Sequence, residues 1–147
     1  MKVIFKSFME LSNDELYALL RLRSEVFVVE QNCPYLDMDE FDQKAMHLLG
    51  FMGQDLIATS RIFAPGEYFK GYASVGRIAT ARKCRALGYG KRIVTESIEK
   101  IYALCGSGCP IKIGAQAYLT RFYESFGFAN TGEEYLEDGI PHVYMIL

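Results

Sequence analysis

The segment with the clearest chemical potential is the turn Arg85-Ala86-Leu87-Gly88-Tyr89-Gly90-Lys91-Arg92. It lies between an apolar, strand-like run at 75–79 and a helix-like run at 93–104. The first N–H groups of a helix have no partner inside it, and the helix dipole favours negative charge there. Glycines let the backbone approach an anion closely, and the flanking basic side chains add Coulombic attraction. The turn therefore predicts a site for a pyrophosphate.

Two common nucleotide motifs do not fit this turn. A P-loop needs glycine at position 85 and a hydroxyl residue at position 92, where the sequence has Arg85 and Arg92. A dinucleotide fingerprint needs a third glycine at position 93, which is isoleucine. The turn is therefore expected to hold a pyrophosphate in another way.

The composition indicates one cytosolic domain. The chain has 147 residues, of which 50% are hydrophobic, and a formal net charge of −2. That size suits one hydrophobic core, so we expect a single domain over residues 1–147. No basic stripe suggests nucleic acid, and no apolar run approaches the roughly 18–20 residues needed to span a membrane. The charged, alternating N-terminus is unlike a secretory signal, so a cytoplasmic location is expected.

Cysteine and histidine do not form a recognisable metal motif. The cysteines, at positions 33, 84, 105 and 109, match neither a zinc-site nor a redox spacing, so we expect free thiols. The only histidines are His47 and His142. No metal site is predicted.

Hydrophobic periodicity and turn residues predict an α/β fold. Ser12 and Glu15 have the spacing of a capping box, before a helix expected to end near Glu30. The other predicted helices are 93–104 and 118–126, and the predicted strands are 3–8, 46–52, 56–63, 72–80, 111–114, 128–135 and 142–147. Helices separated by several hairpin strands imply a mixed sheet with helices on its faces.

Two motifs in this order resemble a known superfamily. Arg85-x-x-Gly88-x-Gly90 after one strand, and Phe122-Tyr123-x-x-x-Gly127-Phe128 after the next, resemble the GNAT superfamily of acyl-CoA-dependent N-acyltransferases. Segments 26–35, 76–77, 114–117 and 137–142 resemble its ElaA-like branch. The resemblance covers nearly the whole chain. It implies a mixed, mostly antiparallel twisted sheet flanked by helices.

The resemblance implies that acetyl-CoA is the acyl donor and that no metal is needed. Its pyrophosphate would bind backbone N–H groups from Leu87 to Arg92, and its pantetheine arm would run between strands 72–80 and 111–114. A backbone N–H near Ile78 or Ala79 would polarise the thioester carbonyl. The residues expected to contact the cofactor are Ile78, Ala79, Arg85, Leu87, Gly88, Tyr89, Gly90, Lys91, Arg92, Gln116 and Tyr123.

Tyr123 is expected to be the general acid. A departing thiolate with a pKa of about 8.5 and a phenol with a pKa of about 10 are close enough for proton donation. The alternative interpretation is that Tyr123 is only part of an aromatic helical stripe with Phe122 and Phe126.

The general base is less defined, because the strand at 72–80 contains no Asp or Glu. Glu30, at the end of the first helix, is the leading candidate. His47 and His142 have a suitable side chain, but a lone histidine near a strand is usually only hydrogen-bonded. A chain of water molecules is a further alternative.

Arg77 and His142 are expected to contact the acceptor. A guanidinium within an apolar strand demands an anionic partner. For Arg77 this partner is either a structural one, Glu30 or a residue of the acidic loop, or a carboxylate of the acceptor. The acidic loop at 37–42 either attracts a cationic acceptor or is merely solvated.

These features favour an enzyme that transfers the acetyl group directly to a primary amine of a small molecule, peptide or protein. The alternatives are a non-catalytic, regulatory domain that binds acyl-CoA, and a ligand-free scaffold. The acceptor and the oligomeric state stay open, and a homodimer paired through the final strands is one option.

Overall fold

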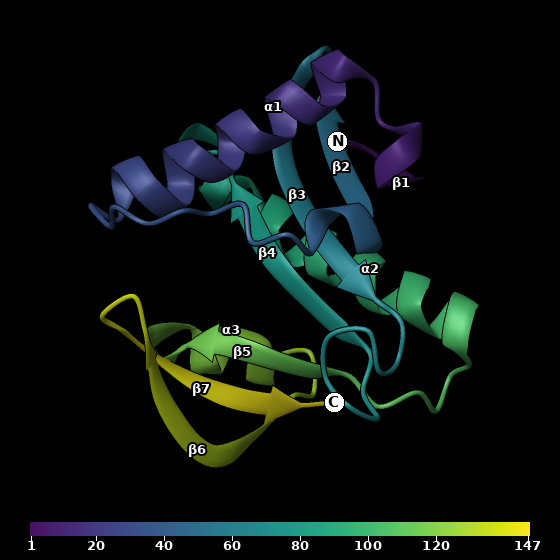
Figure 1. The fold of residues 1–147 in the computed structure, drawn as a ribbon, viewed down its shortest axis with the longest axis vertical. Helices are drawn as coiled ribbons and strands as arrows, with labels where there is room; N and C mark the ends of the chain where they lie inside the picture. Colours follow the sequence, from purple (N-terminus) through teal and green to yellow (C-terminus); the bar gives the residue numbers. More distant parts are fainter.

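Two antiparallel sheets, joined at one end, form the framework of the protein (Figure 1). A computed structural model describes all 147 residues. The first sheet has the order β1-β2-β3-β4, with β1 Lys2–Ser7, β2 Met46–Met52, β3 Asp55–Phe63 and β4 Ser74–Thr80. The second has the order β5-β7-β6, with β5 Lys112–Gln116, β7 Ile140–Ile146 and β6 Ala129–Glu137. The expected mixed α/β architecture is confirmed, but as two sheets.

The two sheets are linked by one parallel bridge, between Ala73 and Ile111. Beyond this bridge β4 and β5 have no ladder of hydrogen bonds between them and diverge, as Figure 1 shows. The expected strand 72–80 therefore begins its ladder only at Ser74. The divergence opens the space in which the candidate site lies.

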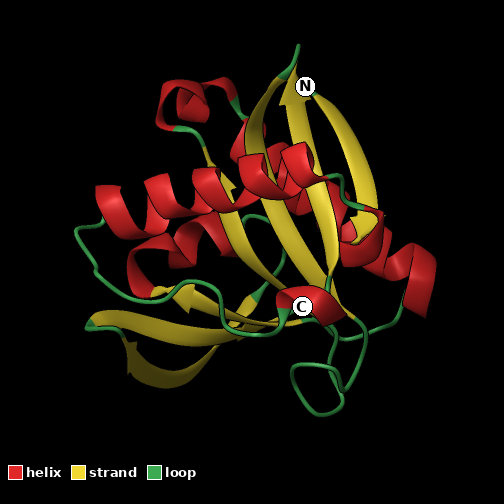
Figure 2. Cartoon of the chain, turned by 45° about the horizontal axis from the view of Figure 1, so that its top comes forward, coloured by secondary structure: helices red, strands yellow, loops and turns green.

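The helices pack on both faces of the first sheet (Figure 2). Helix α1 (Asn13–Arg23) begins with the predicted capping box, in which Glu15 N–H donates to Ser12 Oγ and Ser12 N–H donates to Glu15 Oε2. It continues as a π-helical segment over Ser24–Glu30, so the first helix ends where expected. Helix α2 (Tyr89–Cys105) starts earlier than its apolar pattern predicted, because Gly88 already begins the turn. None of the helices has the length and apolar character that crossing a bilayer requires.

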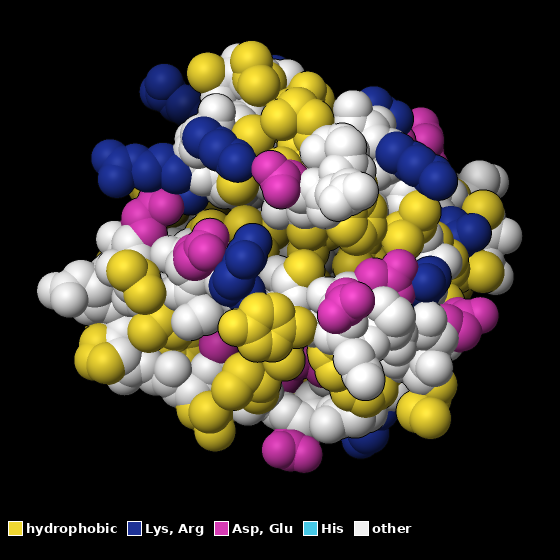
Figure 3. All heavy atoms as spheres, turned by 90° about the horizontal axis from the view of Figure 1, so that it is seen from above, with side chains coloured by type: hydrophobic (Ala, Val, Ile, Leu, Met, Phe, Trp, Pro, Cys, Tyr) yellow, Lys and Arg dark blue, Asp and Glu magenta, His cyan; other side chains and the backbone are white.

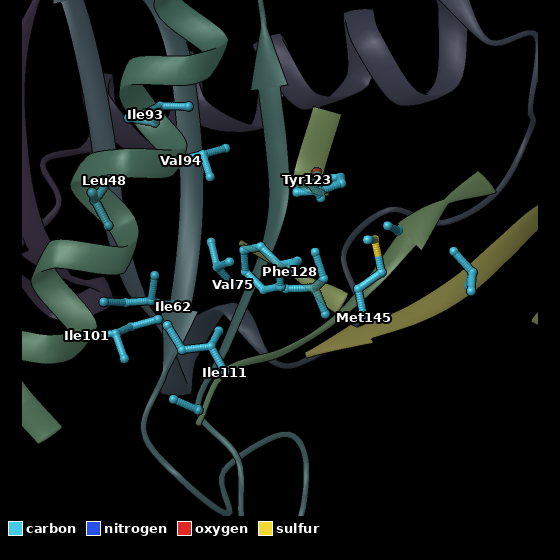
Figure 4. Close-up of a cluster of buried hydrophobic side chains, with 14 of the residues drawn as sticks. Leu48, Ile62, Val75, Ile93, Val94, Ile101, Ile111, Tyr123, Phe128 and Met145 are labelled. Atoms are coloured by element: carbon cyan, nitrogen blue, oxygen red, sulfur yellow. The ribbon is translucent and has the colours of Figure 1, made fainter. Parts of the chain in front are cut away.

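Two apolar clusters fix these helices. Leu19, Leu22 and Val26 of the first helix pack with Leu49 and Leu56 on one face. The larger cluster lies on the other face and contains side chains from both sheets and from α2 and α3 (Thr120–Glu124). Figure 4 shows this cluster, with Tyr123 at its edge next to Phe128. The same cluster thus supports the sheets and anchors a candidate catalytic side chain.

Strand β4 contains a bulge at Arg77 and Ile78. The register pairs Gly76 with Arg61 and Ala79 with Thr59, so two residues of β4 face one residue of β3. Arg77 has a φ of 46°, in the left-handed region. An extra residue reverses the alternation of side chains. Consequently Val75 belongs to the α2 cluster, whereas Ala79 belongs to the α1 cluster.

Charged side chains are interspersed on the face that includes α1. Figure 3 shows Lys and Arg among Asp and Glu there, without a continuous basic stripe. The four cysteines are free thiols.

Candidate active site

The space between β4 and β5 holds two connected pockets of about 270 Å³ each. The turn-side pocket contains Glu30, Arg85 and Tyr118. The inner chamber contains Tyr123, Arg77 and His142, together with many aromatic rings. Five residues line both pockets: Phe27, Gln31, Ile78, Gln116 and Leu119. Arg85 of the predicted pyrophosphate turn and the predicted general acid Tyr123 therefore line two adjoining pockets.

The pyrophosphate turn has the expected backbone form. Arg82–Leu87 is a 3-10 helix, and Gly88 has a φ of 77°, a conformation that favours glycine. The first hydrogen bond of α2 runs from Arg92 N–H to Gly88 O, at 3.1 Å. The N–H groups of Tyr89, Gly90 and Lys91 precede that bond, at the positive end of the helix dipole. The prediction that the Arg92 amide faces an anion is wrong, because this amide is already used in the helix.

Arg85 is paired with Glu30 across the mouth of the turn-side pocket. Arg85 Nη2 donates to Glu30 Oε2 at 2.8 Å, and Nη1 contacts Oε1 in a second charge-assisted bond. The hydrogen bonds and charge of Arg85 hold the pKa of Glu30 below its ordinary value. A carboxylate held in this way is a poor proton acceptor. The geometry therefore contradicts Glu30 as general base and shows it as the partner of the cofactor-side arginine.

Ile78 and Ala79 occupy different positions relative to the cleft. Ile78 lies in the bulge, outside the paired register of β3 and β4, and lines both pockets. Ala79 pairs with Thr59, is 1% exposed and packs against α1. Of the two backbone positions predicted near the thioester, the bulge leaves Ile78 outside the ladder, and Ala79 contributes no side chain to the cleft.

Tyr123 lies at the inner end of the cleft, on α3. Its side chain packs edge to face against Phe122 and Phe128, and the residue is 7% exposed. Its phenol oxygen forms no hydrogen bond with another side chain, and the residue lines the chamber. Burial, and secondarily the phenol of Tyr118, raises the pKa of Tyr123 above its ordinary value. The pKa of the Tyr123 phenol is therefore not close to that of a thiol, contrary to the expectation from the sequence. The phenol keeps its proton at neutral pH.

Gln116 spans the boundary between the two pockets. Its Nε2 donates to Gln31 Oε1 at 3.2 Å, and Gln31 Nε2 donates to Gln116 Oε1 at 3.4 Å. The pair joins the end of the first helix to the end of β5. Gln116 lines both pockets, and its predicted contact with the cofactor stays a prediction, whereas Gln31 is a pocket residue that the sequence reasoning did not identify.

Three of the four carboxylates of the acidic loop are not free to attract an acceptor, because Asp37, Asp39 and Asp42 bind three arginines, whereas Glu40 is exposed. Asp37 Oδ1 accepts from Arg77 Nε at 2.8 Å, and Asp37 Oδ2 accepts from Arg23 Nε at 2.7 Å. The remaining bonds join Arg23 to Asp42, Arg61 to Asp39 and Asp42, and Arg77 to Asp39. We call these six residues the Arg–Asp cluster. The structural interpretation of Arg77 is confirmed, with Asp37 and Asp39 rather than Glu30 as its partners.

The cluster is buried and charge-balanced. Arg23 and Arg61 are 1% and 2% exposed, and three guanidiniums face three carboxylates. Burial alone would raise the pKa of Asp39, but the hydrogen bonds and charge of Arg61, with the charge of Arg77, lower it to about 2. Asp39 therefore stays ionised at neutral pH.

The two histidines differ in access to the cleft. His47 is fully buried outside the cleft, its Nε2 lies 2.9 Å from Asp42 O, and burial lowers its pKa. His142 lines the chamber, and its Nδ1 lies 2.8 Å from Ile140 O. A carbonyl only accepts, so Nδ1 carries the hydrogen and neutral His142 presents a lone pair at Nε2. Of the two, only His142 meets the requirement for a base in the chamber.

Sequence reasoning missed the aromatic residues of the chamber. Tyr135 and Tyr144 stack with ring centroids 4.5 Å apart, and Tyr68 continues the lining from the 64–73 loop. Their positions on two alternating strands could have placed Tyr135 and Tyr144 on one face of a sheet. No local pattern indicates that this face meets the bulge of β4.

Comparison with known proteins agrees with this geometry. The family model of the acetyltransferase (GNAT) domain matches residues 15–147. Protein ElaA of Escherichia coli is 41% identical over 141 residues, 92% of this chain and 89% of ElaA. Its crystal structure aligns with a TM-score of 0.89 at 37% identity, over 99% of this chain and 97% of that chain. An acyl-CoA N-acyltransferase of Pseudomonas aeruginosa aligns with a TM-score of 0.92 at 35% identity, with the same coverage. The matched domain, the ElaA likeness and the split sheet together show that the chain belongs to the GNAT acetyltransferase family.

Proposed function

We propose that this protein transfers the acetyl group of acetyl-CoA directly to a primary amine of a small molecule or peptide. The observation that carries the proposal is the pair of adjoining pockets, one lined by Arg85 of the turn before α2 and the other by Tyr123. Binding of the diphosphate and reaction of the thioester require these two features at opposite ends of one passage.

The turn-side pocket is proposed to receive the cofactor. The pyrophosphate of acetyl-CoA binds the N–H groups of Tyr89, Gly90 and Lys91 and the backbone of Leu87 and Gly88. The side chains of Arg85, Lys91 and Arg92 add charge around it. Arg85 can take part only by exchanging its bond to Glu30 for one to the phosphate. The pantetheine arm then passes Ile78 and Gln116 toward the chamber.

The reaction forms one bond and breaks one. The amine nitrogen attacks the thioester carbonyl carbon, and the Ile78 N–H stabilises the oxygen as it becomes negative. When the tetrahedral intermediate collapses, the carbon–sulfur bond breaks and the electron pair leaves with the CoA sulfur. The ammonium loses two protons in total, one before attack and one after it. One of these protons is balanced by the thiolate, which becomes CoA thiol.

Tyr123 and His142 are assigned to the two proton-handling positions. Tyr123 donates a hydrogen bond from its O–H to the sulfur as negative charge develops there, because burial keeps the phenol protonated. His142 Nε2 accepts a proton from the amine, because Nδ1 is committed to Ile140 O. His142 thus replaces Glu30 as the proposed base.

The test is thiol release from acetyl-CoA in the presence of an amine panel, with Tyr123→Phe and His142→Gln as variants. We expect Tyr123→Phe to lower kcat at least tenfold with little change in the Kd of CoA, because the fold keeps the ring. His142→Gln should lower kcat/KM while the thermal stabilisation by CoA is retained. Unchanged turnover in either variant would withdraw that residue from the mechanism.

The same assay separates an enzyme from a regulatory domain. Thermal stabilisation by CoA reports binding, and a ligand at about 100 times its Kd adds roughly 2.7 kcal/mol. Stabilisation by CoA without thiol release from any amine would contradict the enzyme and favour a domain that only senses acyl-CoA.

A further inference from the structure

Aromatic rings form a continuous wall along the inner chamber. Tyr135 is stacked between His142 and Tyr144, with ring centroids at 5.3 and 4.5 Å. The wall continues from Tyr144 through Phe69, at 5.8 Å edge to face, to Tyr68. These residues come from β6, β7 and the 64–73 loop, so three separate segments contribute flat, apolar surface to one side of the chamber.

Gly114 of β5 makes this wall possible. The register pairs Gly114 with Tyr144, and the ring of Tyr135 reaches across from β6 to lie over Gly114. A Cβ at position 114 would overlap Tyr135 Oη and would lie 3.3 Å from Cζ. Any side chain at this position must therefore displace the Tyr135 phenol from its stacked position.

The charges of the chamber favour a cation over an anion. Its two guanidiniums, Arg61 and Arg77, are already compensated by the Arg–Asp cluster. Arg61 Nε has no partner, but one donor inside a compensated cluster provides no counter-charge for a carboxylate. Glu137, by contrast, lines the chamber with a side chain 44% exposed, 3.5 Å from Tyr135 Oη and 3.9 Å from His142 Nε2.

Two rings of the wall, those of Tyr144 and Phe69, already contact an ammonium group, that of Lys112. Lys112 Nζ lies 4.2 Å from the ring centroid of Tyr144 and 5.3 Å from that of Phe69, outside the lining of the chamber. A cation over an aromatic face is attracted by the ring quadrupole. The wall thus has the electronic character that attracts an alkylammonium.

From these observations we propose that the acceptor is a cationic primary amine on an apolar or aromatic body that carries no carboxylate or phosphate. The inference rests on the proposed function and specifies its substrate class. The body of the acceptor packs on Tyr135, Tyr144 and Tyr68, and its ammonium approaches Glu137 and His142 before losing its proton to Nε2. Acetyl transfer then yields the neutral amide, CoA thiol and one released proton.

Pairs of amines that differ only by a carboxylate test the proposal on the wild-type protein. Phenethylamine is compared with phenylalanine, and tyramine with tyrosine, by thiol release from acetyl-CoA. We expect kcat/KM to be at least tenfold higher for the member without the carboxylate, because the chamber has no free cation to pair with it. Equal or better use of the amino acids would overturn the inference.

The role of Gly114 is tested by Gly114→Ala, Tyr135→Phe and the double variant. Gly114→Ala should raise the KM for phenethylamine at least fivefold, with the thermal shift by CoA unchanged. The double variant should recover to within about twofold of Tyr135→Phe, because removal of Oη leaves the new Cβ facing only ring carbon at 3.3 Å. Gly108→Ala, where a Cβ meets nothing within 4 Å, is the matched control.

Each outcome separates the inference from the proposed function. A Gly114→Ala variant with wild-type KM, or one not rescued by Tyr135→Phe although CoA still stabilises it, would overturn the wall as a specificity determinant. Thiol release with carboxylate-bearing amines alone would overturn the substrate class and leave acetyl transfer intact. No thiol release with any amine would overturn the proposed function, and the inference with it.

Discussion

The protein contains two sets of arginine–carboxylate pairs that face the same cleft and differ in almost every physical respect. The Arg–Asp cluster beside the chamber is buried, charge-balanced and built from three arginines. The Arg85–Glu30 pair at the turn has side chains 43% and 29% exposed and is a single bidentate contact. The Arg–Asp cluster is a fixed part of the structure beside the chamber. The Arg85–Glu30 pair is an ion pair in which an incoming phosphate can take the place of Glu30.

This difference shows that a buried arginine in a binding site need not recognise a ligand. In the cluster, the charges are desolvated and balance one another, so removing one residue leaves a net charge that the others do not compensate. At the turn, water screens the pair, and exchanging one anion for another costs little. The availability of a guanidinium therefore depends on its burial and on how many carboxylates already bind it.

Replacing one arginine from each set should give the largest contrast in stability. Arg61→Met removes one of the two arginines that bind each of Asp39 and Asp42, leaves the buried cluster with an uncompensated negative charge, and should cost about 3–5 kcal/mol in the free energy of unfolding. Arg85→Met, the matched control, should cost no more than about 1 kcal/mol. Urea unfolding monitored by circular dichroism measures both. Equal losses would refute the distinction between a structural cluster and an exchangeable pair.

A smaller effect is expected in the dependence of stability on pH. The folded pKa of Asp39, about 2, lies below the unfolded value of about 3.9. Asp39 therefore stabilises the fold above pH about 4, and this contribution is lost as the pH falls toward 2. Asp39→Asn should reduce the fall of Tm over that interval by roughly 2–4 °C, about 1 kcal/mol after allowance for its partial exposure.

The measurement is a series of thermal melts of both proteins in steps from pH 5 to pH 2. A parallel fall of the two Tm curves would mean that other carboxylates carry the acid sensitivity. Asp55→Asn is the control, because Asp55 pairs with Lys83 at the surface, with side chains 65% and 68% exposed.

The smallest and most specific effect is expected at the turn. Glu30→Gln removes the charge that competes for Arg85, so the Kd of CoA should tighten about two- to fivefold while turnover is retained. Isothermal titration with CoA and the thiol-release assay measure the two quantities. Glu25→Gln is the control, since Glu25 pairs only with Arg21 on the surface of the same helix. A loss of turnover that rises with pH would restore Glu30 as the base.

Local features of the fold were predictable because they depend on residues close in the sequence. The capping box at Ser12 and Glu15, the hairpin of β2 and β3 and the turn at Gly88 each follow from spacing alone. The order of helices and strands, together with the two motifs, was sufficient to identify the family.

Side-chain pairing across the fold was not predictable from pattern. Arg85 lies 55 residues from Glu30, and Arg77 lies 40 residues from Asp37. The sequence offers many carboxylates for each arginine, and only the packed backbone selects among them. For the same reason the sequence left Glu30 as a candidate base, whereas in the structure its carboxylate is bound to Arg85.

The single bridge between Ala73 and Ile111 is the point from which β4 and β5 diverge, so the angle between the two strands is set there. Strand β4 has seven residues beyond that point, which at about 3.3 Å per residue is an arm of roughly 20 Å. A change of about 10° in the angle between β4 and β5 at this bridge would change the distance between their far ends by roughly 3–4 Å. The packing of side chains around Ala73 and Ile111 therefore sets the angle between the two strands. That angle determines the width of the opening through which a flexible ligand arm must pass.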